Sequence, residues 1–208
     1  MVKRESEFLR LDQNTMRSLQ TQNISRASPV GARCLLIVCV VFSSSSFAQQ
    51  TPAPTQLPTA GRVVAGEVGI QQSGASMNVT QTSLRGVVDW ATFNVGSSAQ
   101  VKFIQPSANA VTLNRVLDSN ASQIFGKISS NGQVFLTNPN GLFFSPTSSV
   151  DVGGLVATTM KIGTDDFMSG INKFKSADGL GLVLNQGRLT SSDGGYISLL
   201  APQVRNEG

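Results

Sequence analysis

The chain has 208 residues, enough for one domain with a tail, and it contains no histidine and only two cysteines. Cys34 and Cys39 both lie before Ala48, so Cys nucleophiles, Ser-His-Asp triads and most transition-metal sites are excluded from the remainder of the chain. The segment that ends at Ala48 also holds six of the 16 basic and three of the 12 acidic side chains, which leaves a net charge of +1 for the rest. The overall charge of +4 therefore gives no indication of nucleic-acid binding.

The segment from Met1 to Ala48 has the three parts of a secretory signal peptide. A long polar and basic region precedes a short apolar core, Leu35 to Phe42, and Ser46 and Ala48 supply the small residues of a cleavage site. The apolar core is shorter than the roughly 20 residues that span a bilayer. We therefore predict a signal peptide with an extended N-region over residues 1–48, cleaved between Ala48 and Gln49. A membrane anchor, a buried helix and a downstream start codon remain alternatives.

Residues 49–60 contain three prolines among threonines and glutamines, which is typical of an extended N-terminal tail with little structure of its own. From Gly61 onward, β-branched and aromatic residues form short runs between glycine, asparagine and proline, and this pattern indicates strands and turns. Between residues 122 and 159 the apolar runs are only two to four residues long. Because sandwich strands are usually longer, these runs favour a coil whose wall consists of many small faces.

The most specific motif is the Asn-Pro-Asn-Gly sequence at Asn138–Gly141. Proline presets φ for a turn, glycine adopts positive φ without a Cβ clash, and an asparagine side chain can bond its own backbone two residues further on. The motif predicts a corner between two strands, with Val134, Leu136 and Leu142 pointing inward. A second turn is predicted at Asn131–Gly132. A well-formed turn without any further role is the alternative for both.

Residues 164–175 show apolar side chains at helical spacing: Phe167, Ile171 and Phe174 fit one face of a short helix. Thr164 could cap this helix, and the two aspartates that follow it suit a first helical turn. A glycine at position 170 weakens the pattern, so irregular or hairpin structure is an equal alternative.

A repeat closes the sequence. The tripeptide Asn185-Gln186-Gly187 recurs 21 residues later as Asn-Glu-Gly at 206–208. A unit of this length can hold one solenoid turn of three short strands. Because the second copy stops at the final residue, we expect a longer protein or a product truncated at its C-terminus.

Several motifs together resemble the N-terminal secretion domain of two-partner-secreted exoproteins, the filamentous haemagglutinin and high-molecular-weight adhesin family. The matching residues, in order, are Leu113–Val116, Ser122–Gly126, Asn131–Leu136, Asn138–Gly141 and Gly154–Thr159. The resemblance runs from about Gly61 to the end. It implies an all-β fold over residues 61–208: a right-handed single-stranded parallel β-helix with an N-terminal capping sheet and short excursions from the helix.

The same resemblance implies a non-enzymatic export function without a cofactor. The chain would cross the periplasm and leave the cell through an outer-membrane partner transporter with periplasmic polypeptide-binding domains, and it would then nucleate β-helix folding outside. The residues that the resemblance points to for transporter recognition or folding are Asn131, Gly132, Asn138, Pro139, Asn140 and Gly141. The full-length protein would be secreted or remain at the bacterial surface, where it would bind a host cell. Nucleic acids and small-molecule substrates are not expected partners.

Two other functions remain open. A secreted β-helix enzyme acting on polysaccharide would need grouped carboxylates, but Asp165-Asp166 is the only close acidic pair. Adjacent residues on a strand point to opposite faces, and a solvated loop or helix start explains this pair equally well. The second alternative is the head of a contact-dependent toxin whose toxic region lies elsewhere. An inert structural fragment that is never secreted through a partner is a further alternative.

Overall fold

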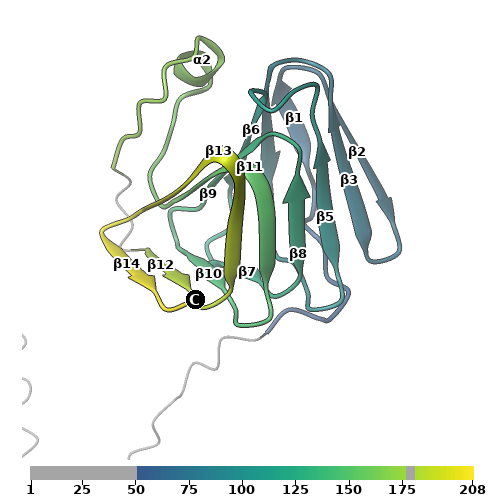
Figure 1. Ribbon diagram of the computed structural model, residues 1–208, viewed down its shortest axis with the longest axis vertical. Helices are drawn as coiled ribbons and strands as arrows, with labels where there is room; N and C mark the ends of the chain where they lie inside the picture. Colours follow the sequence, from purple (N-terminus) through teal and green to yellow (C-terminus); the bar gives the residue numbers. More distant parts are fainter. Residues whose placement is uncertain (1–50, 177–180) are drawn as a thin grey trace, which may run out of the picture. The chain divides into compact units, whose positions relative to one another are not determined.

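A computed structural model describes residues 51–176 and 181–208. The predicted signal peptide and its cleavage site therefore lie outside the described residues. The described chain forms a parallel β-helix of about five turns, in which strands from successive turns lie side by side (Figure 1). The predicted all-β parallel β-helix is confirmed.

Three walls of parallel strands enclose the coil. The first wall holds β3 (Ser76–Gln81), β5 (Gln100–Ile104), β8 (Lys127–Ser130) and the first halves of β11 (Ser149–Thr158) and β13 (Arg188–Leu200). The second wall holds β4 (Arg85–Trp90), β6 (Val111–Val116), β9 (Gln133–Thr137) and the second halves of β11 and β13. The third wall holds β7 (Ser122–Ile124), β10 (Leu142–Phe144), β12 (Leu182–Asn185) and β14 (Gln203–Asn206).

The five turns follow the chain in order. Turn one consists of β3, β4 and an isolated bridge at Val95; turn two of β5, β6 and β7; turn three of β8, β9 and β10. Turn four comprises β11 and β12, and turn five comprises β13 and β14. In turn four one strand passes from the first wall to the second, and its register shifts between Val152 and Gly154. Such a bulge bends a strand and lets it turn a corner without a loop.

Two antiparallel strands cap the start of the coil. β1 (Arg62–Ala65) pairs with β4 of the second wall, and β2 (Val68–Ser73) pairs with β3 of the first wall. Strand edges at the end of a solenoid need such a cover. The predicted N-terminal capping sheet is confirmed.

The third wall is covered differently, by the segment that the sequence suggested would have little structure. Residues 51–60 form neither a strand nor a helix of their own, but their carbonyl groups accept hydrogen bonds from the coil. Gly96 N donates to Gln56 O at 2.9 Å, and Ser98 N donates to Pro54 O at 2.8 Å. Leu57 is buried in the coil interior. Composition did not reveal this docking, because the bonds are made by backbone carbonyl groups, which every residue has. An extended proline-rich segment can therefore bind the N–H groups of another segment without any special side chain.

The coil interior is filled by apolar side chains from all three walls, and Val134, Leu136 and Leu142 point into it as predicted. A second, smaller cluster lies outside the coil, on the outer face of the second wall. Its members are Val87, Val111, Leu113, Phe135, Val156, Ile162 and Phe167. Within residues 51–176 and 181–208, no helix is both long enough and apolar enough to cross a membrane.

Part of this outer cluster comes from an excursion between β11 and β12. One helical turn, α2 (Thr164–Met168), lies in a loop whose ends pair antiparallel at Lys161 and Lys175. The cap residue is Gly163, without a side-chain hydrogen bond, so the predicted capping role of Thr164 is wrong. Ile171 is exposed, which contradicts the predicted face, whereas Phe167 and Phe174 pack inward. The physical reason is that the helix stops before Gly170, where φ is +84°.

The repeat that closes the sequence corresponds to one turn of the coil. β12 and β14 pair in parallel with Asn185 opposite Asn206. The side chains of the two copies also bond, with Asn185 Nδ2 donating to Asn206 Oδ1 at 2.7 Å. The prediction that the repeat marks a solenoid turn is confirmed.

Candidate functional site: the polar corners of the coil

The Asn138–Gly141 motif forms the corner between β9 and β10. Gly141 N donates to Asn138 O at 3.0 Å, which closes a four-residue turn, and Gly141 has φ of +116°, as predicted. Asn140 N donates to Asn138 Oδ1 at 2.9 Å, the predicted bond two residues further on. The turn is therefore defined locally by its own residue types.

The side chain of Asn138 also joins this corner to the turn before it. It is fully buried, and its Nδ2 donates to Asn120 O and to Ser122 Oγ, both at 3.0 Å. On the other side, Asn138 N donates to Thr158 O at 3.0 Å, in the turn that follows. One residue thus connects turns two, three and four. Loss of its amide would remove the donor to the buried Ser122 hydroxyl.

Gly141 is required for space as well as for its backbone conformation. A Cβ atom at this position would lie 2.8 Å from Leu182 O and 3.4 Å from the Ala121 Cβ. Both neighbours belong to adjacent turns, so a side chain here would push the turns apart. Either cause alone would favour glycine.

The Asn131–Gly132 motif forms a different corner, between β8 and β9. Asn131 Nδ2 donates to Gln105 O at 2.7 Å, while Gln105 N donates to Asn131 Oδ1 at 2.8 Å. The side-chain amide therefore pairs with the backbone of the preceding turn as another strand residue would. This corner is joined to its neighbour by a side chain on the surface of the coil.

Beneath this corner lies a network of buried amides and hydroxyls. Gln105 Nε2 donates to Thr112 Oγ1 at 3.0 Å and to Gln133 O at 3.1 Å, and Thr112 Oγ1 donates to Gln81 Oε1 at 2.6 Å. The network reaches from turn one to turn three. Gly132 fits against it because a Cβ there would meet Gln105 Oε1, with Ala110 O and Ser107 O at 2.8 Å.

The two predicted motifs do not form one site. Asn131 and Gly132 precede β9, and residues 138–141 follow it, so the motifs occupy opposite ends of the same strand. Pro139 is partly exposed and Asn140 is exposed, with its Nδ2 donating to Asp118 O at 2.7 Å. What the motifs share is a position at a corner where one turn is bonded to the next.

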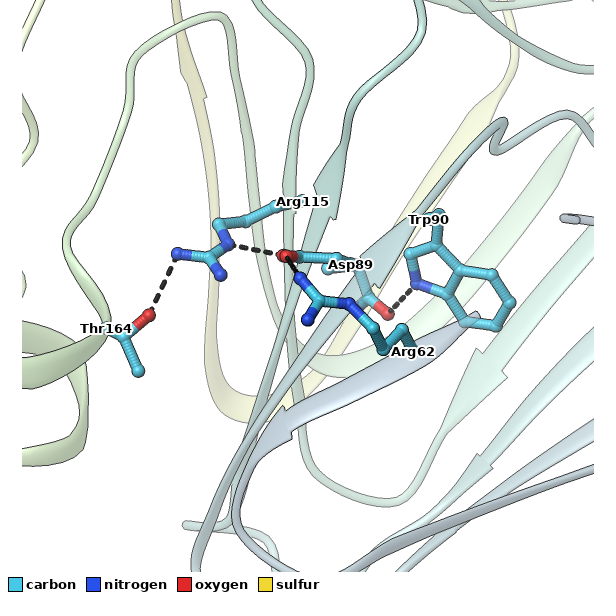
Figure 2. Close-up of polar contacts among 6 residues, drawn as sticks. Arg62, Asp89, Trp90, Arg115 and Thr164 are labelled. Atoms are coloured by element: carbon cyan, nitrogen blue, oxygen red, sulfur yellow. Dashed lines mark hydrogen bonds and ion pairs between the residues drawn. The ribbon is translucent and has the colours of Figure 1, made fainter. Parts of the chain in front are cut away.

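Sequence analysis missed a buried charge cluster at the start of the second wall (Figure 2). Asp89 accepts hydrogen bonds from Arg115 Nε at 2.7 Å and from Arg62 Nη2 at 3.2 Å, and Arg115 Nη1 donates to Thr164 Oγ1 at 2.9 Å. Beside it, Trp90 Nε1 donates to Asn114 Oδ1 at 3.0 Å in the interior. The available signal was a carboxylate inside an apolar strand, because a buried charge requires partners.

Arg85 and Tyr196 lie on the same outer face. Arg85 Nη1 donates to Phe167 O at 2.8 Å, and its guanidinium carbon lies 4.8 Å from the Phe167 ring centroid. Tyr196 donates its hydroxyl to Gln133 Oε1 at 2.6 Å. Burial raises the pKa of the Tyr196 phenol, and the Arg85 charge partly opposes that rise. Both side chains bind neighbouring groups of the fold.

The carboxylates do not gather into a site. Within the described ranges, no group of three or more acidic side chains could hold a metal ion. Asp165 and Asp166 begin the helical turn of the excursion, with Asp165 exposed and Asp166 partly exposed.

Comparison with known proteins gives a consistent result. The TPS secretion domain family model matches residues 49–208. A heme/hemopexin-binding protein of Haemophilus influenzae is 35% identical over 181 residues, covering 83% of this chain and 19% of the relative. A second heme/hemopexin-binding protein of that species is 40% identical over 125 residues, covering 60% of this chain and 13% of the relative. The chain thus spans at most about a fifth of the length of these relatives.

A solved structure supports the same assignment. The crystal structure of the HMW1 secretion domain from Haemophilus influenzae matches with a TM-score of 0.70 and 29% sequence identity. The match covers 73% of this chain and 41% of the solved one. Taken with the capped β-helix and its bonded corners, these similarities show that the chain belongs to the TPS secretion domain family of two-partner secretion exoproteins.

Proposed function

We propose that this domain directs an exoprotein through one specific outer-membrane β-barrel transporter and then nucleates its β-helix. TPS secretion domains are non-enzymatic export domains that work with an outer-membrane transporter, and proteins that carry them are exported. The finer steps belong to the proposal. The chain enters the periplasm on a signal peptide, crosses it largely unfolded, and is taken up by the transporter's periplasmic domains.

The observation that carries the uptake step is the strand-forming sequence of the capping segments, which become edge strands once the domain has folded. Each of β1 and β2 pairs with a single neighbour and stands at an end of the strand order in its sheet. β2 has the sequence Val-Gly-Ile-Gln-Gln-Ser, without a charge or a proline to discourage strand addition. In the unfolded chain this segment can join a sheet edge of the transporter, where backbone hydrogen bonds supply affinity.

The corners support the second step, folding outside the cell. Each strand of a new turn pairs with the turn before it, and the amides of Asn131 and Asn138 fix where the chain bends. A turn that has formed therefore presents the register for the next one. The capping strands and residues 51–60 cover the three edges at which winding starts.

Binding of a host cell, and the haem or hemopexin binding named for the relatives, belong in this proposal to other regions of an exoprotein. The chain has no histidine, and its two cysteines lie in the predicted signal peptide. Histidine and cysteine, two common axial ligands of haem, are thus absent from residues 49–208. A polysaccharide enzyme is not favoured, because the carboxylates are dispersed.

The test separates export from stability at the Asn138–Gly141 corner. Asn138→Ala removes the side-chain bonds to Asn120 O and Ser122 Oγ in the preceding turn, and Gly141→Val adds strain and a clash with Leu182 O. Export into the medium and the melting temperature of the purified domain are measured for each. If the corner serves folding alone, export falls only as far as stability falls; if the transporter also reads it, export falls further. Full export of the double variant would refute both roles.

A matched control uses the neighbouring exposed residue. Asn140→Ala removes a bond from an exposed side chain to Asp118 O but leaves the buried amide of Asn138 in place, so we expect a smaller loss of export than in Asn138→Ala. An Asn140→Ala variant that fails in export with unchanged melting would instead assign recognition to the exposed side of the turn.

A further inference from the structure

The excursion between β11 and β12 lies across turns that were formed long before it in the sequence. We define the clasp as residues 161–175, from the Lys161–Lys175 bridge inward. Its apolar side chains, Ile162, Phe167, Met168 and Phe174, pack on the outer face of the second wall.

The residues beneath the clasp come from successive turns. Val87 belongs to turn one, Leu113 to turn two, Phe135 to turn three and Val156 to turn four. Phe167 is fully buried, and its ring centroid lies 5.9 Å from that of Phe135, while the Phe174 ring lies 6.0 Å from the same ring. The clasp therefore belongs to one apolar cluster with side chains from four turns.

Polar contacts hold the clasp at the two turns that are most distant from its own position. Arg85 of turn one donates to Phe167 O at 2.8 Å and lies over the Phe167 ring. Arg115 of turn two donates to Thr164 Oγ1 at 2.9 Å while its Nε binds Asp89. The clasp therefore reaches the charge cluster under the capping strand β1.

This geometry changes how stability is distributed. Strand pairing joins each turn only to its neighbours, so a plain solenoid can fray one turn at a time from either end. We propose that the clasp makes turns one to four a single cooperative unit, and that the capped N-terminal turns reach full stability only when residue 175 is in place. In a chain that emerges from its amino end, the clasp would close after the fourth turn has begun.

Hydrogen exchange of the purified domain tests this without a transporter. Phe167→Ala removes the ring at the centre of the clasp. Removal of a buried side chain greatly increases the fraction of molecules in which the amide hydrogen bonds are open. We therefore expect amides of β4 and β6 to exchange more than about tenfold faster. Faster exchange confined to residues 161–175, with β4 and β6 unchanged, would overturn the proposal.

The control is Leu189→Ala in turn five, outside the proposed cooperative unit. Leu189 belongs to β13, is partly buried and packs against the coil interior. We expect exchange in β4 to stay at the wild-type rate in this variant. If Leu189→Ala accelerates β4 as much as Phe167→Ala does, the effect is a general loss of stability and the proposal fails.

A milder variant keeps the test informative if Phe167→Ala does not fold. Thr164→Val preserves the shape of the side chain and removes only the acceptor for Arg115. It should accelerate exchange in β4 and β6 by a smaller factor and leave β14 unaffected. Unchanged exchange in β4 and β6 would contradict a cooperative clasp.

Discussion

The side-chain amide of Asn131 pairs in both directions with the backbone of Gln105, donating to its carbonyl at 2.7 Å and accepting from its N–H at 2.8 Å. The amide thereby extends the hydrogen bonding of the first wall by one more position. It does so at a corner, where the backbone itself has turned away and can no longer provide those bonds.

Replacing Asn131 with alanine should therefore loosen two adjacent turns. The residue is exposed, so water can replace part of what is lost, and we expect the free energy of unfolding to fall by about 1 kcal/mol. Urea denaturation measures the change. The control is Asn109→Ala, an exposed asparagine in the loop that precedes β6, which should shift the midpoint very little. Equal effects from the two variants would mean that the Gln105 pairing contributes nothing.

The two arginines on Asp89 should contribute unequally. The Arg62 side chain is 73% exposed, whereas that of Arg115 is 22% exposed and also donates to Thr164. Arg62→Ala should change the free energy of unfolding by less than about 0.5 kcal/mol, as an exposed ion pair does. Arg115→Ala should lower the free energy of unfolding by about 2 kcal/mol, because the buried Asp89 carboxylate would then have only the exposed Arg62 as its ion-pair partner. Denaturant midpoints of the two variants give the comparison, and a larger effect of Arg62→Ala would contradict it.

Trp90 is the single tryptophan of the chain and can report on turn one directly. Asn114→Ala removes the acceptor of its buried indole N–H, and we expect a loss of about 2–3 kcal/mol in unfolding free energy. The transition is followed by Trp90 fluorescence in urea. Asn78→Ala, an exposed position on β3, is the control. A midpoint for Asn114→Ala that matches this control would show that the indole finds another partner.

Processing can be checked on secreted material. Cleavage after Ala48 predicts that N-terminal sequencing begins at Gln49, because small residues at 46 and 48 fit the cleavage site. Ala48→Leu should block this cut and reduce the amount of mature protein. A mature protein that still carries Leu35 to Phe42 would refute the signal peptide and support a membrane anchor.

The sequence predicted those features that depend on residues close together in the chain. The turn at Asn138–Gly141 follows from proline, asparagine and glycine at fixed offsets, and its bond from Asn140 N to Asn138 Oδ1 joins residues two apart. The partners of the clasp could not be predicted in this way. Arg85 and Phe167 are 82 residues apart, and nothing local to either residue specifies the other.

One prediction was wrong and one buried residue was missed, for different reasons. The helical spacing of Phe167, Ile171 and Phe174 assumed that one conformation continues through Gly170, but positive φ there ends the helix and exposes Ile171. The proline-rich residues 51–60 offered no apolar period to interpret, yet Leu57 fills the end of the coil. At residues 51–60 a distant surface, rather than the local sequence, decided that Leu57 is buried.

Asn185 lies opposite Asn206 in the next turn, so the 21 residues between these positions are the length of one turn at the C-terminal end of the coil. Insertion of one complete turn after β12 would keep inward-facing side chains inward, whereas insertion of a single residue within a strand would move the following side chains to the opposite face. A complete turn inserted between β4 and β11 would have another consequence. It would move Arg85 about 4.8 Å further from the loop that carries Phe167, so the reach of that loop limits how many turns can precede it.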